Sequence, residues 1–295
     1  MTGADERHRA VLSRLRMPAP VLAALACPHC GAGLAPAGDA LGCAGGHAFD
    51  VARQGYASLL TGQRRPAAPG DDATMVHDRE EFLEAGHFAP LARRITEVVA
   101  GLAPDPGMVA DVGAGTGYYL RHVLDALPGV HGLALDTSVY ALRRASRAHP
   151  RAGAASCDAW RVLPLRTGAV GVLLNVFAPR NGPEFRRVLA DSGALVVVAP
   201  TGRHLAELRE PLGLIRVAPD KEDRVARRLA TGFAVEGREE VTASLRLDRA
   251  GVRTIVGMGP SARHADPAVL RRRISALAET VEVTASWTLS VYRPT

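Results

Sequence analysis

A glycine-rich turn limits the possible folds of this chain more than any other segment. Residues 109–118 read VADVGAGTGY, an apolar run that meets an acidic residue and then alternate glycines at Gly113, Gly115 and Gly117. This pattern is typical of a buried strand that turns tightly into a helix, because glycine permits a sharp turn and a close approach of the backbone to a ligand. The first N–H groups of the helix then face that ligand. The segment therefore predicts an α/β sheet that binds a nucleoside-bearing cofactor.

The spacing of the glycines indicates which cofactor the turn holds. A dinucleotide-binding turn has the spacing G-x-G-x-x-G. Here the third glycine comes one residue earlier, and Tyr118 stands where the last glycine would be. The shorter loop leaves no room for a pyrophosphate and fits a ligand made of an amino acid and a nucleoside, as S-adenosylmethionine is. A glycine turn in another kind of α/β domain stays open as an alternative at this point.

The length and the hydrophobic content bound the domain organisation. A chain of 295 residues with 47% hydrophobic residues can form one sizeable α/β domain and a small accessory module. No apolar run approaches the roughly 18 residues that cross a bilayer, and the apolar run at 21–26 is too short for a secretory signal. We therefore expect a cytoplasmic protein with no membrane partner.

The formal net charge is +6, and it comes almost wholly from arginine, since Lys221 is the only lysine. GC-rich codon usage is one explanation of this bias. A nucleic-acid partner is the other, because arginine makes bidentate contacts to phosphate and stacks on bases. Each cluster taken alone is explained equally well by a solvated helix face. The clusters lie at 7–16, 64–65, 93–94, 143–147, 227–228 and 271–273.

Short apolar runs alternate with amphipathic segments from residue 108 onward, which predicts a mostly parallel, seven-stranded Rossmann-like sheet with helices on both faces. The strands are expected at 108–112, 131–135, 152–155, 169–176, 193–199, 240–247 and 281–292. The helices are expected at 117–127, 138–148, 183–190, 203–212, 220–231, 249–257 and 267–278. Ser138 and Asp266 stand where N-caps are needed.

Four divisions of the chain follow from these patterns: a basic N-terminal extension at 1–19, a cysteine-bearing module at 20–60, a linker with a helical connection at 61–104, and the α/β domain at 105–295. The span 61–72 has no hydrophobic period and is expected to be a loop. The span 73–102 has a helical pattern that ends before Pro104.

Three of the four cysteines fall in the spacing C-x2-C-x12-C-x3-H, formed by Cys27, Cys30, Cys43 and His47. Two such knuckles complete a tetrahedral structural zinc site, and metal binding would supply much of the folding free energy of so short a module. His29 competes weakly as a ligand, and disulfides or free thiols are the alternative. The fourth cysteine, at position 157, is expected to be a small buried residue rather than a nucleophile.

Acidic and polar side chains follow the predicted strands at the edge where a cofactor would bind. Asp136 ends the second strand 19 residues after Gly117, where a carboxylate accepts hydrogen bonds from both ribose hydroxyls. Asp158 follows the third strand and is a candidate for the adenine amino group. Helix capping is the alternative role for Asp136.

The ends of the fourth and fifth strands supply the candidates for the acceptor. In such folds the carboxyl end of strand four meets the transferable methyl and its acceptor, so Asn175 and Phe177 are candidates for placing a flat base. Core packing is the alternative for Phe177. His204 follows strand five and faces the cofactor, caps a helix or faces solvent.

Taken together, these residues resemble the 23S ribosomal RNA guanine-N1 methyltransferases, a family that includes macrolide-resistance enzymes of the tylosin-resistance type. The resemblance runs over most of the chain. Its motifs are the zinc knuckles with the glycine turn, and the segments 46–50, 54–60, 84–88, 175–179, 203–208 and 258–260.

The resemblance implies a zinc-ribbon module that recognises RNA, a Rossmann-like class I methyltransferase domain, and a homodimer that holds an RNA hairpin. It implies further that Phe88, Gly115, Thr116 and His204 contact the cofactor. The segment 178–181 and the arginine-rich composition resemble the resistance branch, which implies nucleotide 748 in the loop of hairpin 35 rather than nucleotide 745.

The chemistry that this resemblance implies asks little of the protein. A sulfonium methyl is already electrophilic, so the enzyme mainly aligns the acceptor and excludes water. We expect the guanine to be flipped from its loop and held by Phe177 and Asn175. Two other classes stay open, a small-molecule methyltransferase with an assembly-only zinc module, and an RNA-binding protein without catalysis.

Overall fold

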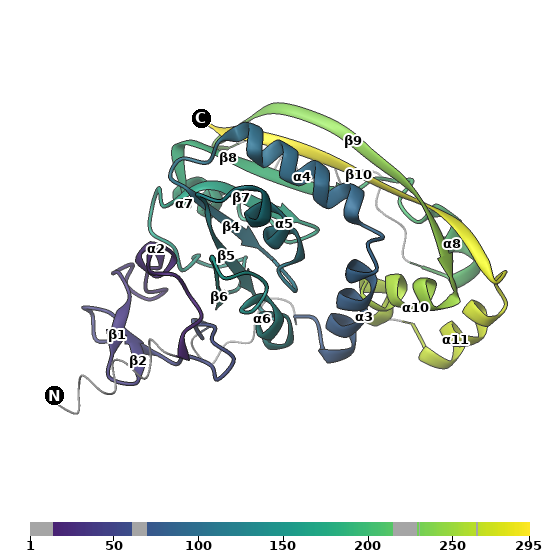
Figure 1. Cartoon of the computed structure of the whole chain (residues 1–295), viewed down its shortest axis with the longest axis horizontal. Helices are drawn as coiled ribbons and strands as arrows, with labels where there is room; N and C mark the ends of the chain where they lie inside the picture. Colours follow the sequence, from purple (N-terminus) through teal and green to yellow (C-terminus); the bar gives the residue numbers. More distant parts are fainter. Residues whose placement is uncertain (1–13, 61–69, 215–228, 230, 264) are drawn as a thin grey trace.

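A seven-stranded sheet forms the centre of the computed structural model, which describes residues 14–60, 70–214, 229, 231–263 and 265–295 (Figure 1). The strands lie in the order β6-β5-β4-β7-β8-β10-β9. Their bounds are β4 (Met108–Val112), β5 (His131–Asp136), β6 (Ala152–Ser156), β7 (Val170–Val176), β8 (Leu189–Pro200), β9 (Phe233–Asp248) and β10 (Thr280–Pro294).

Five neighbouring strands, β4 to β8, run parallel, and β10 runs antiparallel to both β8 and β9. Numbered in chain order within the sheet, the strands follow 3-2-1-4-5-7-6. The chain direction across the sheet reverses between β4 and β7, and ligands of open α/β sheets bind outside the carboxyl ends of the strands at such a point. This arrangement confirms the predicted Rossmann-like, mostly parallel sheet.

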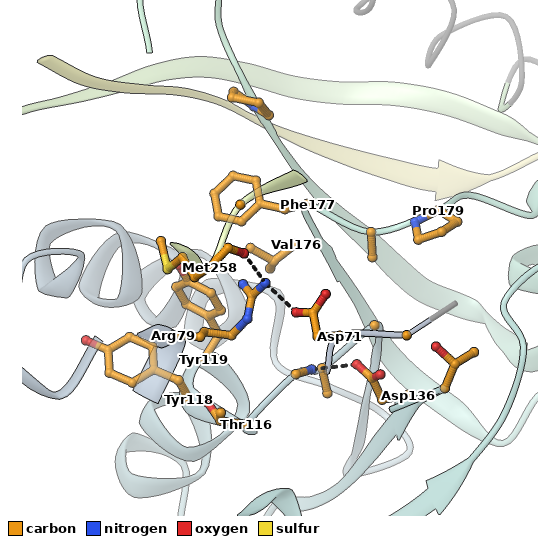
Figure 2. Close-up of a pocket in the computed structure, with 18 of the residues that line it drawn as sticks. Asp71, Arg79, Thr116, Tyr118, Tyr119, Asp136, Val176, Phe177, Pro179 and Met258 are labelled. Atoms are coloured by element: carbon orange, nitrogen blue, oxygen red, sulfur yellow. Dashed lines mark hydrogen bonds and ion pairs between the residues drawn. The ribbon is translucent and has the colours of Figure 1, made fainter. Parts of the chain in front are cut away.

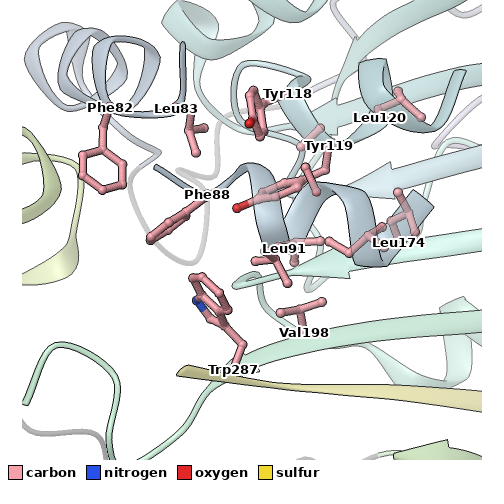
Figure 3. Close-up of a cluster of buried hydrophobic side chains, with 14 of the residues drawn as sticks. Phe82, Leu83, Phe88, Leu91, Tyr118, Tyr119, Leu120, Leu174, Val198 and Trp287 are labelled. Atoms are coloured by element: carbon pink, nitrogen blue, oxygen red, sulfur yellow. The ribbon is translucent and has the colours of Figure 1, made fainter. Parts of the chain in front are cut away.

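The parallel strands β4, β6 and β7 are buried along their whole length, as expected for parallel strands covered on both faces, whereas the antiparallel edge strand β9 is largely exposed. Successive residues of β4 enter opposite cores: Val109 packs into one and Ala110 into the other. The first core contains α3 (Ala73–Glu84), α4 (Ala89–Leu102) and α5 (Tyr118–Ala126). The second contains α2 (Ala19–Ala24) and α7 (Gly182–Val188). Figure 3 shows Phe88 in the first core, between Phe82 and Trp287, with ring centroids 5.0 and 4.9 Å away.

The span predicted as one helical pattern, 73–102, forms two helices instead. The chain turns between α3 and α4, where Gly86 has a φ of +79° that residues with a side chain rarely adopt. The two predicted N-caps are confirmed: Ser138 Oγ accepts from Ala141 N, and the Asp266 carboxylate accepts from Ala268 N and Val269 N.

The described residues contain four further α-helices and one 3₁₀ helix. Their bounds are α6 (Val139–Ala145), α8 (Ala206–Leu212), α10 (Arg249–Gly257), the 3₁₀ helix η1 (Pro260–Arg263) and α11 (Pro267–Ser275). No helix within the described ranges is long and apolar enough to cross a membrane.

The N-terminal module has its own small sheet of β1 (Ala35–Ala37), β2 (Ala40–Gly42) and β3 (Ala48–Phe49), and it is joined to the β6 edge of the large sheet. Ala57 pairs with Ala155, and Ser146 Oγ donates to Gln54 O at 3.0 Å. The module is therefore fixed on the main domain and not merely tethered to it.

Several sequence expectations lie outside the described residues. They are most of the basic segment at 7–16, the loop at 61–69 with its arginine pair, and the helix expected at 220–231, of which only 229 and 231 are described.

Candidate active site and metal centre

A cavity of about 640 Å³ opens at the carboxyl ends of the central strands, at the point where the strand order reverses (Figure 2). Most of the residues predicted from the sequence line it: Phe88, Gly113, Gly115, Thr116, Asp136, Asp158, Phe177 and His204. Gly117 and Asn175 do not appear among its lining residues. The fold thus brings together residues from six separate segments into one site.

The glycine turn follows β4 with three left-handed backbone conformations. The φ angles of Gly113, Gly115 and Gly117 are +82°, +56° and +81°. A Cβ on Gly117 would lie 3.1 Å from Ala148 Cβ, so this glycine permits α5 to pack closely on the end of α6. Gly117 therefore faces the end of α6 and lies outside the cavity, while Gly113 and Gly115 line the cavity.

The carboxylate of Asp136 is held in place at the end of β5. Its Oδ2 accepts from Gly115 N at 2.9 Å and its Oδ1 from Ser138 N at 2.8 Å. Burial raises the pKa of this carboxyl, and the two backbone hydrogen bonds oppose that rise. The residue predicted to hold the ribose hydroxyls is thus fixed by the glycine turn itself.

Asp111, the acidic residue of the glycine motif, has no protein partner. It is 1% exposed, it lines the cavity, and neither carboxylate oxygen has a hydrogen bond. Burial and the neighbouring charge of Asp136 raise the pKa of its carboxyl to about 8. A buried polar group without a partner costs roughly 1–3 kcal/mol, so Asp111 needs a ligand that supplies a donor or a positive charge.

Tyr119, which also lines the cavity, is a second buried polar residue without a hydrogen-bond partner. Its hydroxyl is buried without a partner, and burial raises its pKa. Asp111, Asp136 and Tyr119 supply polar groups to the lining, and Phe88 and Val176 supply apolar surface. A ligand with an ammonium group, ribose hydroxyls and an apolar purine fits this lining, as S-adenosylmethionine would.

Charged residues that the sequence did not single out close one side of the cavity. Arg79 Nη2 donates to Asp71 Oδ2 at 2.7 Å and to Met258 O at 2.9 Å, as Figure 2 shows. Arg263 Nη2 donates to the other oxygen of Asp71 at 3.1 Å. These residues come from segments more than 170 positions apart, so no local pattern indicates that they meet.

The corner after β7 places Phe177 at the cavity and Asn175 beneath it. Phe177 is 36% exposed and has a φ of +57°, a strained value for a residue with a side chain. Asn175 is fully buried, and its amide donates to Val112 O at 3.3 Å and to Pro179 O at 2.9 Å. The amide group of Asn175 thus ties the end of β7 to β4 and to the corner, while its Oδ1 is buried without a hydrogen-bond partner.

The two remaining predicted residues also lie at the cavity. His204 Nδ1 accepts from Ser286 N at 3.3 Å, which orients the ring against Phe88. Asp158 is buried, and its Oδ1 accepts from Trp160 N at 3.0 Å.

The metal-ligand prediction corresponds to a compact cluster in the N-terminal module. The ligand atoms of Cys27, Cys30, Cys43 and His47 all lie within 4.8 Å of one another. Nδ1 of His47 is 3.4 Å from Cys43 Sγ and 3.6 Å from Cys27 Sγ, so His47 presents Nδ1 to the centre. Three thiolates and one imidazole form a closed set typical of structural zinc.

The alternative of disulfides does not hold. The sulfur atoms of Cys30 and Cys43 are 3.6 Å apart, far longer than a disulfide bond, and all four cysteines are free. His29 is exposed and lies outside the cluster, with its ring 4.8 Å from that of His47. Cys157 is buried, as predicted, and burial raises the pKa of its thiol.

Comparison with known proteins decides the family. The chain is 52% identical over 288 residues to a protein of Micromonospora griseorubida assigned as a 23S rRNA (guanine-N1)-methyltransferase, covering 92% of this chain and 97% of that protein. It is 49% identical over 273 residues to the 23S rRNA (guanine(748)-N1)-methyltransferase of Streptomyces fradiae, covering 92% and 96%. The chain belongs to the 23S rRNA (guanine-N1)-methyltransferase family. This confirms the resemblance stated from the motifs.

A domain model described as "RlmA, N-terminal", a zinc ribbon, matches residues 25–66 of this methyltransferase. The match includes all four residues of the Cys3His cluster. The methyltransferase therefore combines a zinc ribbon with the Rossmann-like domain, and its two cofactors are S-adenosylmethionine and a structural zinc ion.

Proposed function

We propose that this enzyme transfers the methyl group of S-adenosylmethionine to N1 of guanine 748 in the loop of hairpin 35 of 23S rRNA. The observation that carries the proposal is the 49% identity, over 92% of the chain, with the Streptomyces fradiae enzyme named for that nucleotide. The cavity supports it, because its lining fits a zwitterionic nucleoside cofactor and opens beside an exposed aromatic ring.

Four acidic or aromatic residues would hold the cofactor. The unpartnered carboxylate of Asp111 would pair with the ammonium of the amino-acid moiety, and Asp136 would accept hydrogen bonds from the ribose hydroxyls. Asp158 would accept from the adenine amino group. Phe88 provides an apolar wall at the same cavity. The cofactor, when bound, supplies a methyl group on a sulfonium that needs no further activation.

Phe177 would receive the acceptor base. A flipped guanine stacks on aromatic side chains, and such stacking contributes roughly 1–3 kcal/mol per base. Asn175 donates to Val112 O at the end of β4 and to Pro179 O beyond Phe177, which ties this corner to the neighbouring strand. The protein thereby aligns N1 with the methyl and keeps water out. Transfer breaks the bond between the methyl carbon and sulfur and leaves S-adenosylhomocysteine, while the N1 proton passes to a base or to water.

The zinc ribbon would bind the RNA hairpin outside the cavity. None of the described residues 14–60 lines the cavity, so the ribbon is available for a separate contact. We propose the division into 1–19, 20–60, 61–104 and 105–295 as functional units, with two chains pairing around one hairpin. Methylation of ribosomal RNA assigns the enzyme to the cytoplasm and, at nucleotide 748, is expected to confer resistance to tylosin-type macrolides.

Transfer of labelled methyl groups tests this function. Purified enzyme with radiolabelled S-adenosylmethionine should label an unmodified 23S transcript and leave other RNAs of equal length unlabelled. Transfer to small molecules of a host extract, with none to the transcript, would establish a biosynthetic methyltransferase instead. Failure to bind the labelled cofactor at all would indicate an RNA-binding protein without catalysis.

A further inference from the structure

A second pocket, of about 530 Å³, opens beside the cofactor cavity between α3, α5 and α6. The two share Thr116 and Tyr118, so the pocket adjoins the glycine turn from the outside. Its lining includes four arginines: Arg121, Arg143, Arg144 and Arg147. Part of the arginine cluster at 143–147, which the sequence explains equally well as a solvated helix face, therefore lines a concave site.

Two of these arginines are neutralised by glutamates of α3. Arg121 Nη2 lies 2.9 Å from Glu84 Oε1, and Arg144 Nε lies 3.1 Å from Glu80 Oε2. The other two, Arg143 and Arg147, form no ion pair with any described carboxylate. The pocket therefore carries the uncompensated charge of two guanidinium groups.

Arg143 is also held in an orientation that leaves a donor unused. Its guanidinium carbon lies 5.4 Å from the centroid of the Tyr140 ring, and its Nε is buried without a hydrogen-bond partner. A buried donor of a charged group without an acceptor is costly, which is why such groups normally have a partner. An anion with oxygen acceptors would be a suitable partner for this guanidinium group.

The position of the pocket indicates where such an anion comes from. Gln54, a residue of the cysteine-bearing module at 20–60, lines it, and its backbone carbonyl accepts a hydrogen bond from Ser146 Oγ of the main domain. The pocket thus lies at the junction of the ribbon and the sheet, next to the cavity. The junction therefore lies between the two parts of the enzyme that the proposed function assigns to the RNA, the ribbon and the cavity.

We propose that this pocket binds a backbone phosphate of the substrate RNA close to the flipped guanine, with Arg143 and Arg147 as its ligands. Guanidinium groups match phosphate oxygens in bidentate geometry, and Arg143 is already oriented by Tyr140. This inference rests on the proposed function. It adds to the zinc ribbon and the base site a third, sequence-independent contact that fixes the register of the RNA.

The double variant Arg143→Gln with Arg147→Gln tests the proposal through the salt dependence of binding. Each phosphate contact that is lost lowers the slope of log Kd against log salt concentration by about 1. We expect that decrease for a 23S fragment containing hairpin 35, with a Kd about tenfold higher at 0.15 M salt. The kcat at saturating RNA and the affinity for S-adenosylmethionine should stay at the wild-type values.

A matched control separates a local contact from the general field of the protein. Arg271→Gln with Arg272→Gln removes the same charge from exposed positions of α11, which lies at the end of the molecule opposite the zinc ribbon (Figure 1). This variant should keep the wild-type slope. Arg147→Gln alone changes an exposed residue, so it should fold normally and raise the Kd by an intermediate factor.

Three results would overturn the inference. The first is a salt-dependence slope of the Arg143→Gln, Arg147→Gln variant equal to that of the wild type. The second is an equal decrease of the slope in this variant and in the Arg271→Gln, Arg272→Gln control. The third is a loss of affinity for S-adenosylmethionine, and not for RNA, in the Arg143→Gln, Arg147→Gln variant. The last result would assign the pocket to the cofactor site. A wild-type protein that neither binds nor methylates the RNA would contradict the proposed function itself, and this inference with it.

Discussion

The guanidinium of Arg79 bridges Asp71 and the carbonyl of Met258 across one side of the cofactor cavity, with N–O distances of 2.7 and 2.9 Å. Ser138 Oγ fixes the same segment by donating to Asp71 O at 2.5 Å. The strand end that holds Asp136, the start of α3 and the end of α10 are thereby linked through one aspartate.

Asp71→Ala should weaken the binding of S-adenosylmethionine by about tenfold, because both Arg79 and Arg263 lose their carboxylate at the cavity wall. Isothermal titration calorimetry measures the change. Glu97→Gln removes an exposed ion pair of α4 and serves as the control, with an affinity equal to the wild type. Equal affinities for all three proteins would show that the link plays no part in cofactor binding.

Phe177→Gly should lower the activity on RNA and leave the stability of the fold nearly unchanged. Glycine relieves the positive φ at this position, and this offsets the lost contacts, so the free energy of unfolding should change by less than about 1 kcal/mol. Loss of the stacking surface should lower kcat/KM for RNA by about 10- to 100-fold. Steady-state kinetics and urea unfolding measure both. Val235→Ala, an exposed apolar residue of β9, should leave kcat/KM unchanged, and an unaffected Phe177→Gly enzyme would exclude the stacking role.

Asp111 should make the cofactor-free protein less stable as pH rises. Its carboxyl has a pKa of about 8 in the folded state against 3.8 in the unfolded chain, so between these values the folded state binds one proton more. Stability therefore falls from pH 4 to pH 8 by an amount on the order of a few kcal/mol. Asp111→Asn removes this term.

Urea unfolding at pH 5 and pH 8 checks the Asp111 prediction. The stability of Asp111→Asn relative to the wild type should increase from the lower to the higher pH. The exposed substitution Asp39→Asn should show no such increase. Parallel pH profiles for the wild type and Asp111→Asn would contradict the assignment of this buried carboxyl.

The zinc ribbon should bind one zinc ion per chain, and its loss should affect the binding of RNA but not the binding of S-adenosylmethionine. Cys30→Ser should abolish zinc binding, measured by metal analysis, and weaken RNA binding by at least about tenfold. Affinity for S-adenosylmethionine should change little, because no ligand of the cluster lines the cavity. Cys157→Ala should retain the zinc, and a zinc-free wild type would contradict the metal site.

The parts of this molecule that are local in sequence were predictable. The strand positions follow from apolar runs, the caps at Ser138 and Asp266 from single residues, and the metal cluster from its spacing, since short-range geometry sets each of them. Strand β9 is longer than the expected 240–247 because it pairs with β10 along its whole length. That partner, and not β9's own pattern, sets where the strand begins.

The features that depend on distant contacts were not predictable. Asp71 lies in a polar segment without a period, and Arg79 has the appearance of a solvated helix residue until Met258 and Arg263 come beside it. Asn175 was placed correctly at the end of its strand, but strand position does not indicate whether a side chain points into the cavity or under the corner. Its neighbours Val112 and Pro179 decide that.

The position of the methyl group on the RNA tests the central claim most directly. Unmodified 23S rRNA is incubated with the enzyme, with and without S-adenosylmethionine, and then copied by reverse transcriptase, which stops at a base methylated on N1. The account predicts a cofactor-dependent stop at guanine 748 of hairpin 35, absent when Asp136→Ala replaces the wild type. A cofactor-dependent stop elsewhere, or none in hairpin 35, would contradict it.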